Sequence, residues 1–263
     1  MSLTLDIAAT GMAAQELNVN TISNNIANMT TTGYKRQRAE FQDLLYEHVR
    51  RIGTQTSTNG NILPVGIDLG GGVKTVGTPR LMTQGTLSQT GADLDLSVTG
   101  EGFFKVLMPD GSFTYTRDGS FSMDSQGRVV TPAGNVLQPG ITIPNNAQSI
   151  TISSVGQVSV NVPGSTTPSV LGQITMTRFL NKAGLQAIGD NAFLETPASG
   201  TPQDGLPGTD GYGTLTQGSL EQANVEAVTE ISDLIAAQRA YEMNGKVITS
   251  ADQMLQTTSQ LMR

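Results

Sequence analysis

The chain has 263 residues, a formal net charge of −7 and no cysteine. The length predicts one or two domains, and the lack of cysteine excludes disulfide scaffolds, thiolate zinc sites and thiol catalysis. Hydrophobic residues make up 37% and aromatic residues 5% of the chain, which favours a modest β-domain with segments that bury apolar faces against other molecules. Because the basic residues are scattered, the sequence predicts no nucleic-acid partner.

The N-terminal part, residues 3–47, is predicted to be helical, with a break after Met29 and a second short helix over residues 39–51. Apolar residues recur in alternating steps of three and four, which indicates a heptad seam. The seam consists of Leu5, Ala8, Met12, Gln15, Val19, Ile22, Ile26 and Met29. Three asparagines near its end, Asn24, Asn25 and Asn28, either cap the helix or bond between packed subunits. We favour the second interpretation, because Asn is a poor interior helix residue.

The middle of the chain, residues 54–218, is rich in Gly, Thr, Ser and Pro. Residues 149–153 and 157–162 alternate between apolar and polar, as half-buried strands do. Turn dipeptides at 110–111, 118–119 and 126–127 lie between short aromatic or β-branched stretches and predict a meander of hairpins. Residues 197–213 are polar and rich in Gly and Pro, which predicts a surface loop.

The C-terminal part, residues 219–263, is predicted to be helical again, with an apolar face wide enough for more than one neighbour. One column at seven-residue spacing is large and apolar, and comprises Ala227, Leu234, Tyr241, Ile248, Leu255 and Met262. A second column is small or polar, and comprises Glu230, Ala237, Asn244, Ala251 and Thr258. Gly245 weakens a free helix, and a close helix crossing there is an expected compensation.

These parts predict an α+β fold, in which coiled-coil-forming N- and C-terminal helices flank a central all-β domain built of hairpins. Residues 1–50 and 219–263 would form a discontinuous helical inner domain. Residues 51–78 would be an extended insertion or linker, and residues 79–218 a β-rich outer domain. Because a long helix needs its apolar face covered, this layout indicates a subunit that polymerises through its ends. The helices would line the core of the polymer.

Three sets of motifs resemble the flagellar rod and hook proteins, the axial protein family. Residues 23–36 resemble the N-terminal signature of that family, and residues 224–244 its C-terminal hallmark. Residues 100–106, 115–121 and 129–131 resemble the β-domain that rod and hook subunits share. The signature positions are Ala27, Thr32, Gly33, Tyr34 and Lys35 in the first motif, and Gln238, Arg239 and Ala240 in the second.

Within that family, the chain length and residues 55–75 most resemble subunits of the distal rod. The positions that carry this likeness are Leu63, Pro64, Gly66 and Gly71. The resemblance implies helical self-assembly into a stiff hollow shaft that transmits torque from motor to hook, with the insertion locking neighbours. Self-assembly is assigned to Leu5, Met12, Val19, Ile22, Asn24, Asn25, Ile26, Asn28, Leu234, Tyr241, Asn244, Ile248, Leu255 and Met262.

The resemblance also implies the partners and the location. The partners would be further copies of the chain, proximal rod subunits below, hook or hook-adjacent subunits above, and the ring proteins of the peptidoglycan and outer membrane. The subunit would leave through the flagellar type III export apparatus without a cleaved signal peptide, and would lie in the basal body across the periplasm and outer envelope. No cofactor and no metal site are expected, and no stretch reaches the ~18 apolar residues of a membrane span.

Two alternatives stay open. The chain could be another axial subunit, of the proximal rod or the hook. It could also be an envelope-associated carbohydrate-binding or hydrolytic module that uses paired carboxylates, drawn from Asp93, Asp95, Asp110, Asp118 and Asp124. The turn glycines beside most of them favour a local structural role. The single histidine, His48, is expected on a helix surface or at an interface. Deleting residues 1–35 or 225–263 is expected to abolish tube formation and to leave the β-body folded.

Overall fold

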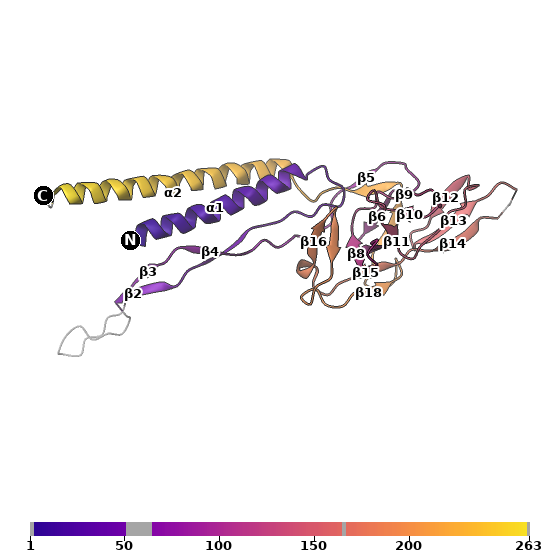
Figure 1. Cartoon of the computed structure of the whole chain (residues 1–263), viewed down its shortest axis with the longest axis horizontal. Helices are drawn as coiled ribbons and strands as arrows, with labels where there is room; N and C mark the ends of the chain where they lie inside the picture. Colours follow the sequence, from indigo (N-terminus) through magenta and orange to yellow (C-terminus); the bar gives the residue numbers. More distant parts are fainter. Residues whose placement is uncertain (1–2, 51–64, 165–166, 262–263) are drawn as a thin grey trace. The chain divides into compact units, whose positions relative to one another are not determined.

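The computed structural model of the chain describes residues 3–50, 65–164 and 167–261 (Figure 1). The chain divides into two units, each of which collects segments distant in sequence. Unit 1 comprises Met1–Ile26, Gln37–Pro79 and Glu226–Arg263, and unit 2 comprises Ala27–Arg36 and Arg80–Val225. Two terminal helices and a central set of antiparallel hairpins confirm the predicted α+β class.

Unit 1 contains both long helices, α1 (Leu3–Ala27) and α2 (Ala227–Leu261). The N-terminal helix ends two residues before the predicted break. The C-terminal helix starts later than predicted, because Ser219–Glu221 form the strand β20, which pairs with β5 (Leu87–Gln89). The heptad patterns therefore predicted the helices correctly, while the helical boundary at residue 219 is wrong.

The other part of unit 1 is an arm in which two segments of the chain, residues 40–50 and 67–77, run antiparallel. Strand β1 (Glu40–Asp43) pairs with β4 (Val73–Gly77), and β2 (Tyr46–Arg50) pairs with β3 (Ile67–Gly70), all antiparallel. The predicted second helix over residues 39–51 is therefore wrong. Helix propensity is a weak prior, and residues 67–77 supply backbone partners that hold residues 40–50 extended.

Unit 2 is built of short strands in antiparallel pairs. They are β5, β6 (Leu96–Thr99), β7 (Phe103–Leu107), β8 (Phe113–Thr116), β9 (Ser122–Met123), β10 (Val129–Val130), β11 (Val136–Leu137), β12 (Ser149–Ile152), β13 (Gln157–Asn161), β14 (Ser169–Gln173), β15 (Met176–Arg178), β16 (Gln186–Gly189), β17 (Ala192–Leu194), β18 (Gln203–Gly205), β19 (Thr214–Gln217) and β20. A single 3-10 turn, Lys182–Gly184, follows β15 in the described part of unit 2.

The largest sheet of unit 2 has nine strands, in the order β16-β17-β8-β7-β11-β10-β9, with β15 on β7 and β18 on β15. A second sheet has the order β12-β13-β14, and its first hairpin is the one that the alternating pattern predicted. The turns at 110–111 and 126–127 close the pairs β7–β8 and β9–β10, as predicted. The turn at 118–119 differs, since β8 and β9 on its two sides are not paired. The predicted loop 197–213 contains β18.

The core of unit 2 consists of two clusters of buried side chains. The larger cluster is aliphatic apart from two phenylalanines, Phe104 and Phe121, whose rings meet edge to face at 5.1 Å. The smaller one is aromatic, with Tyr115 and Phe179 at 4.7 Å and Phe103 against Phe179 and Phe193. Aromatic side chains therefore dominate only the smaller cluster of the β-body.

Candidate self-assembly site

The two helices of unit 1 pack antiparallel. The Nδ2 atom of Asn25 donates to Oε2 of Glu230 at 3.1 Å. Toward the other end of α1, a Cβ atom placed on Gly11 would lie 2.8 Å from Nδ2 of Asn244. Falling numbers on α1 are thus matched by rising numbers on α2. Glycine at position 11 permits this close approach.

The face that α2 turns toward α1 is its small and polar column. Glu230, Ala237 and Ala251 are buried, with exposed fractions of 1%, 3% and 4%. Asn244, in the same column, is half-buried beside Gly11. Small residues let the helix backbones approach, so this column is suited to the contact within one subunit.

The large apolar column of α2 lies elsewhere. Leu234 and Ile248 are half-buried, while Tyr241 and Leu255 are 44% and 51% exposed. Apolar side chains with exposed fractions between 43% and 74% continue on both sides of this column, namely Val228, Ile231, Ile235, Met243, Val247 and Met254. An exposed apolar surface of this extent marks an interaction face.

The predicted residues of α1 divide between buried and accessible positions. Ile22 and Asn25 are buried, and Asn24 is exposed. The remaining ones in α1, Leu5, Met12, Val19 and Ile26, are half-buried, as is Asn28, which follows the end of α1. Asn25 has partners inside the chain, because it donates to the carbonyl of Gln37 and accepts from the Gln37 amide, both at 2.9 Å. For Asn25, bonding within the subunit therefore replaces the favoured interpretation of bonding between subunits.

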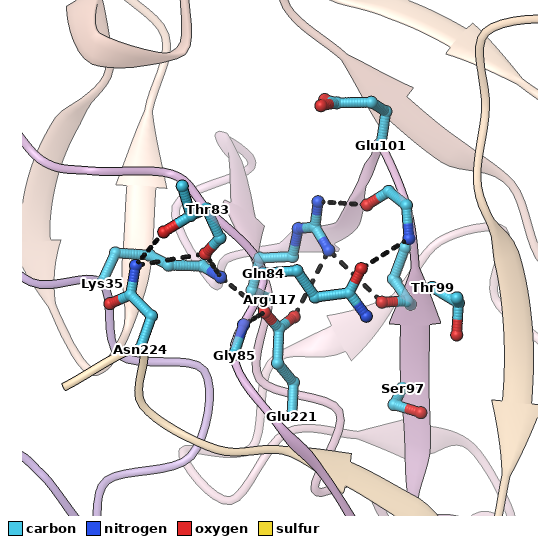
Figure 2. A network of polar contacts seen from close by, with 12 residues as sticks. Lys35, Thr83, Gln84, Gly85, Ser97, Thr99, Glu101, Arg117, Glu221 and Asn224 are labelled. Atoms are coloured by element: carbon cyan, nitrogen blue, oxygen red, sulfur yellow. Dashed lines mark hydrogen bonds and ion pairs between the residues drawn. The ribbon is translucent and has the colours of Figure 1, made fainter. Parts of the chain in front are cut away.

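A buried polar network in unit 2 joins the segment that follows α1 to the segment that precedes α2 (Figure 2). The Lys35 ammonium lies 2.5 Å from Oε1 of Glu221, and the Arg117 guanidinium lies 3.3 Å from Oε2 of the same carboxylate. The exposed fractions of the three side chains are 1%, 0% and 3% for Lys35, Glu221 and Arg117. We call these residues the latch.

Backbone groups add further hydrogen bonds to the latch. The Gly85 amide donates to Oε1 of Glu221 at 2.9 Å, and Lys35 donates to the Thr83 carbonyl at 2.9 Å. Arg117 donates to the carbonyl of Gly100 at 2.7 Å. Buried charges are tolerated only when they are paired and hydrogen-bonded in this way. The latch therefore holds residues 27–36, residues 80–85 and the segment before α2 against the β-body.

A second set of hydrogen bonds, made by amide groups, strengthens the same junction. Asn224 accepts from the Arg36 amide at 2.7 Å, and donates to the carbonyls of Leu81 and Thr83. The Gly33 amide donates to the Glu221 carbonyl at 2.7 Å. The segments that follow α1 and precede α2 are thus bonded to each other.

The electrostatics of the latch are dominated by burial. Burial lowers the pKa of Lys35, and the Glu221 carboxylate opposes that change through charge and a hydrogen bond. Burial also lowers the pKa of Arg117, again opposed by Glu221. Two cations share one carboxylate, so Glu221 is the residue on which the network depends.

The signature positions of the N-terminal motif belong largely to this junction. Ala27 is the last residue of α1, whereas Gly33, Tyr34 and Lys35 are buried in unit 2. Gly33 has a φ of +68°, and a Cβ there would lie 2.7 Å from the backbone nitrogen of Asp118, so only glycine fits. The Thr32 carbonyl accepts from the Asn191 side chain at 2.8 Å.

This placement revises the expected effect of one deletion. Removing residues 1–35 would take Gly33, Tyr34 and Lys35 out of unit 2, so the β-body would lose part of its own interior. A deletion that ends at residue 26 spares the latch.

The C-terminal signature lies on α2, where Gln238 and Arg239 are exposed and Ala240 is half-buried. In the arm, Gly66 precedes β3 and Gly71 lies between β3 and β4. The predicted positions Leu63, Pro64 and Met262 fall outside the described residues. His48 is in strand β2 rather than on a helix, with Nδ1 2.6 Å from Oδ1 of Asp68 on an exposed surface.

The aspartates of the hairpins act as turn acceptors. Oδ1 of Asp110 accepts from the amide and hydroxyl of Ser112, and these bonds lower the pKa of Asp110. Asp118 accepts in the same way from Ser120. Backbone bonding from Arg128 lowers the pKa of Asp124. A general acid needs a raised pKa, so Asp110 and Asp124 are poorly suited to the general-acid role in glycoside hydrolysis.

Among the described residues, no group of three or more His, Cys, Asp or Glu side chains could hold a metal ion. Neither described helix is long and apolar enough to cross a membrane.

Comparison with known proteins shows the family to which the chain belongs. Sequence models of three families match it: flagella basal body rod protein over residues 5–35, the D1 domain of flagellar hook protein FlgE/F/G over residues 97–160, and the C-terminal part of flagellar basal body rod FlgEFG protein over residues 216–261. The flagellar basal-body rod protein FlgG of Caulobacter vibrioides is 56% identical over 98% of both chains. The chain belongs to the FlgG family.

Further members of the FlgG family match at similar length. The flagellar basal-body rod protein FlgG of Buchnera aphidicola is 48% identical over 97% of this chain and 98% of its own. That of Agrobacterium fabrum is 48% identical over 97% of both. These matches over nearly the whole chain therefore confirm the resemblance of the motifs to axial proteins.

Two members of the latch were not selected as functional residues from the sequence. Lys35 was assigned through its motif, but Glu221 and Arg117 were not. Glu221 lies three residues before the C-terminal motif, and no spacing pattern in the sequence distinguishes it.

Proposed function

We propose that this FlgG-family chain is a structural, non-catalytic subunit that self-assembles helically into the distal rod of the flagellar basal body. The rod would be a rigid drive shaft that transmits torque from the motor to the hook. The observation that carries the proposal is the large apolar face of α2, which stays accessible although α1 packs against the small column of the same helix.

The physical argument concerns where this face can be buried. At about 25 cal/mol per Å² of apolar surface, covering side chains such as Tyr241 and Leu255 favours association strongly. The α1 partner already occupies the column that contains Ala237 and Ala251. Further copies of the chain are therefore the proposed occupants of the remaining face.

The proposal assigns roles to the predicted positions. Other copies would contact the accessible residues of α1 and α2, which include Leu5, Met12, Val19, Leu234, Ile248 and Leu255. Residues 1–50 and 219–263 would form the inner domain, apart from residues 27–36 and 219–225, which belong to unit 2. Residues 51–78 would be the insertion, and residues 79–218 the outer domain. In the inner domain, residues 40–50 would contribute strands β1 and β2 of the arm.

The proposed partners follow from a place in the rod. Proximal rod subunits would lie below and hook or hook-adjacent subunits above, with peptidoglycan- and outer-membrane-ring proteins around the shaft. The subunit would leave through the flagellar type III export apparatus and take its place in the basal body, which spans the periplasm and outer envelope. The exposed apolar side chains of the arm, such as Leu45 and Val49, support a locking role for the insertion.

Sedimentation and electron microscopy of the purified full chain test this function. The wild type should form straight hollow tubes at high concentration, and the double variant Ile235→Ser/Tyr241→Ser should stay monomeric with unchanged β-sheet signal. Leu180→Ser is the matched control, since Leu180 is 94% exposed on the β-body, and this variant should still form tubes. The reverse pattern, tubes lost in the control and kept in the double variant, would place assembly in the body instead.

A further inference from the structure

The C-terminal end of α2 continues past the end of α1 (Figure 1). From Asn25 to Gly11 on α1, and from Glu230 to Asn244 on α2, the pairing moves fourteen residues along each helix. Leu3, the first described residue of α1, is then level with about residue 252 of α2. Burial changes at the same point, because Ala251 is 4% exposed and every residue from 252 to 260 is exposed. We call residues 252–260 the overhang.

The overhang has apolar side chains that its own subunit leaves uncovered. Met254 is 62% exposed and Leu255 is 51% exposed. Leu255 continues the seven-residue column that contains Leu234, Tyr241 and Ile248. Burying these side chains against another molecule would remove apolar surface from water and favour association.

A groove lies between α1 and α2 nearer the middle of the helix pair. It is lined by Glu16, Val19, Gln238, Tyr241 and Glu242. Its volume of about 280 Å³ can receive apolar side chains of the size of Met or Leu. Val19 and Tyr241 supply apolar surface, and two carboxylates are present in the lining.

The charge of the overhang fits this groove. The overhang has one charged side chain, Asp252 at its first position, which accepts a hydrogen bond from the Gln256 amide at 2.9 Å. Residues 253–260 contain no charged side chain, and the amides of Gln253 and Gln260 can donate hydrogen bonds to Glu16 and Glu242. The residues that line this groove include no cation that would favour a strongly acidic partner.

The overhang cannot fill the groove of its own subunit. Tyr241 and Met254 are thirteen residues apart on one straight helix, which is roughly 20 Å. The two surfaces are therefore different patches of one chain, and joining them between copies gives a head-to-tail contact. Contacts of this kind generate open helical arrays when the rotation does not close.

We propose that the overhang of one subunit packs into the α1–α2 groove of a second copy, with Met254 and Leu255 against Val19 and Tyr241. This inference rests on the proposed self-assembly and identifies one contact that carries it. It places the longitudinal link of the polymer between two helical surfaces, one at the end of α2 and one at its middle.

Cysteine cross-linking tests the contact cleanly, because the chain has no cysteine of its own. The full-length double variant Val19→Cys/Met254→Cys should give a ladder of disulfide-linked multimers under mild oxidation, which a reductant abolishes. Each single variant should give no ladder, since position 19 of one copy meets position 254 of the next. An intramolecular bond is excluded by the distance, because disulfides need Cα atoms within about 7 Å.

Val19→Cys/Val228→Cys is the matched control, because Val228 is 74% exposed on the same helix but outside the overhang. This control should give no ladder. If Val19→Cys lowers the helical signal, the exposed groove residue replaces it, as Gln238→Cys/Met254→Cys, with the same expected ladder.

Three results would overturn the inference. Tubes that form without a ladder in either double variant would reject this contact and leave the proposed function standing. A ladder of equal length in the Val228 control would show random collision. A wild-type chain that forms no tubes would reject the proposed self-assembly, and the contact with it.

Discussion

Lys35 and Glu221, separated by 186 positions in the sequence, form an ion pair at 2.5 Å in the interior of unit 2. One follows α1 and the other precedes α2. The pair therefore fixes the two chain segments that lead to the helices, and Arg117 shares the carboxylate. Through Lys35, the N-terminal family signature forms part of the interior of its own subunit.

Removal of Glu221 should be the most damaging change in the latch. Glu221→Ala would leave Lys35 and Arg117 as buried cations, and we expect a loss of about 3–5 kcal/mol in the free energy of unfolding. Lys35→Met should cost less, about 1–3 kcal/mol, because Glu221 keeps Arg117 and the Gly85 amide. Urea denaturation of the purified variants measures both.

An exposed ion pair provides the control for the latch. Arg38 and Glu40 have exposed fractions of 57% and 42%, so Arg38→Met should change the free energy of unfolding by less than about 1 kcal/mol. Equal losses for Arg38→Met and Glu221→Ala would mean that burial does not govern the latch.

Alkaline pH should weaken the β-body through Tyr115. Burial and the neighbouring Glu195 raise the pKa of Tyr115 above its ordinary value of 10.0. A raised folded pKa means that Tyr115 contributes stability below pH 10 and that this contribution is lost as pH rises further. The free energy of unfolding of Tyr115→Phe should therefore fall less than that of the wild type between about pH 9 and about pH 11.

Lys35 should act in the opposite direction over the same range. Its pKa is lowered by burial, so the unfolded chain binds more protons there and rising pH relieves an unfavourable contribution. The free energy of unfolding of Lys35→Met should thus fall more steeply with pH than that of the wild type. Parallel pH profiles for Lys35→Met and Tyr115→Phe would contradict these assignments.

Two deletions that differ by nine residues separate the latch from the helix. A chain lacking residues 1–26 should keep a folded β-body and lose tube formation, because α1 is gone and the latch remains. A chain lacking residues 1–35 should also lose body stability, by ~3 kcal/mol or roughly 6–12 °C in the midpoint of thermal unfolding. Calorimetry compares the two, and identical midpoints would show that residues 27–35 contribute nothing to the body.

Substitutions at two glycines of the helix pair should change the stability in opposite directions. Gly11→Leu would push against Asn244, and we expect a loss of about 1–3 kcal/mol from overpacking. Around Gly245 no atom lies within 4 Å of an added Cβ, so the close crossing expected at Gly245 lies at Gly11 instead. Gly245→Ala should then raise the helix stability by about 0.5–1 kcal/mol. Thermal unfolding followed by the helical circular dichroism signal decides this, and a stabilising Gly11→Leu would refute the assigned crossing.

Local patterns accounted for much of the fold. Heptad spacing located α1 and α2, and alternating residues predicted the β12–β13 hairpin. Turn dipeptides predicted two of the three hairpin turns correctly. These features depend on neighbours within a few positions, which a sequence displays directly.

Long-range pairing was the part that local patterns missed. Residues 40–50 have a helical composition, yet strands of residues 67–77 hold them extended. The latch joins Lys35, Arg117 and Glu221 from three distant segments, and no spacing rule connects them. The choice between the two columns of α2 also depended on the partner helix, because Gly11 and the small residues of α1 favour the small column.

Electron cryomicroscopy of tubes grown from the purified full-length chain tests self-assembly through the terminal helices most directly. The expected map has α1 and α2 in the innermost layer, with Leu234, Tyr241, Ile248 and Leu255 buried between subunits. A chain that forms no tubes, or tubes in which this column of α2 faces solvent, would contradict the proposed role of the helices.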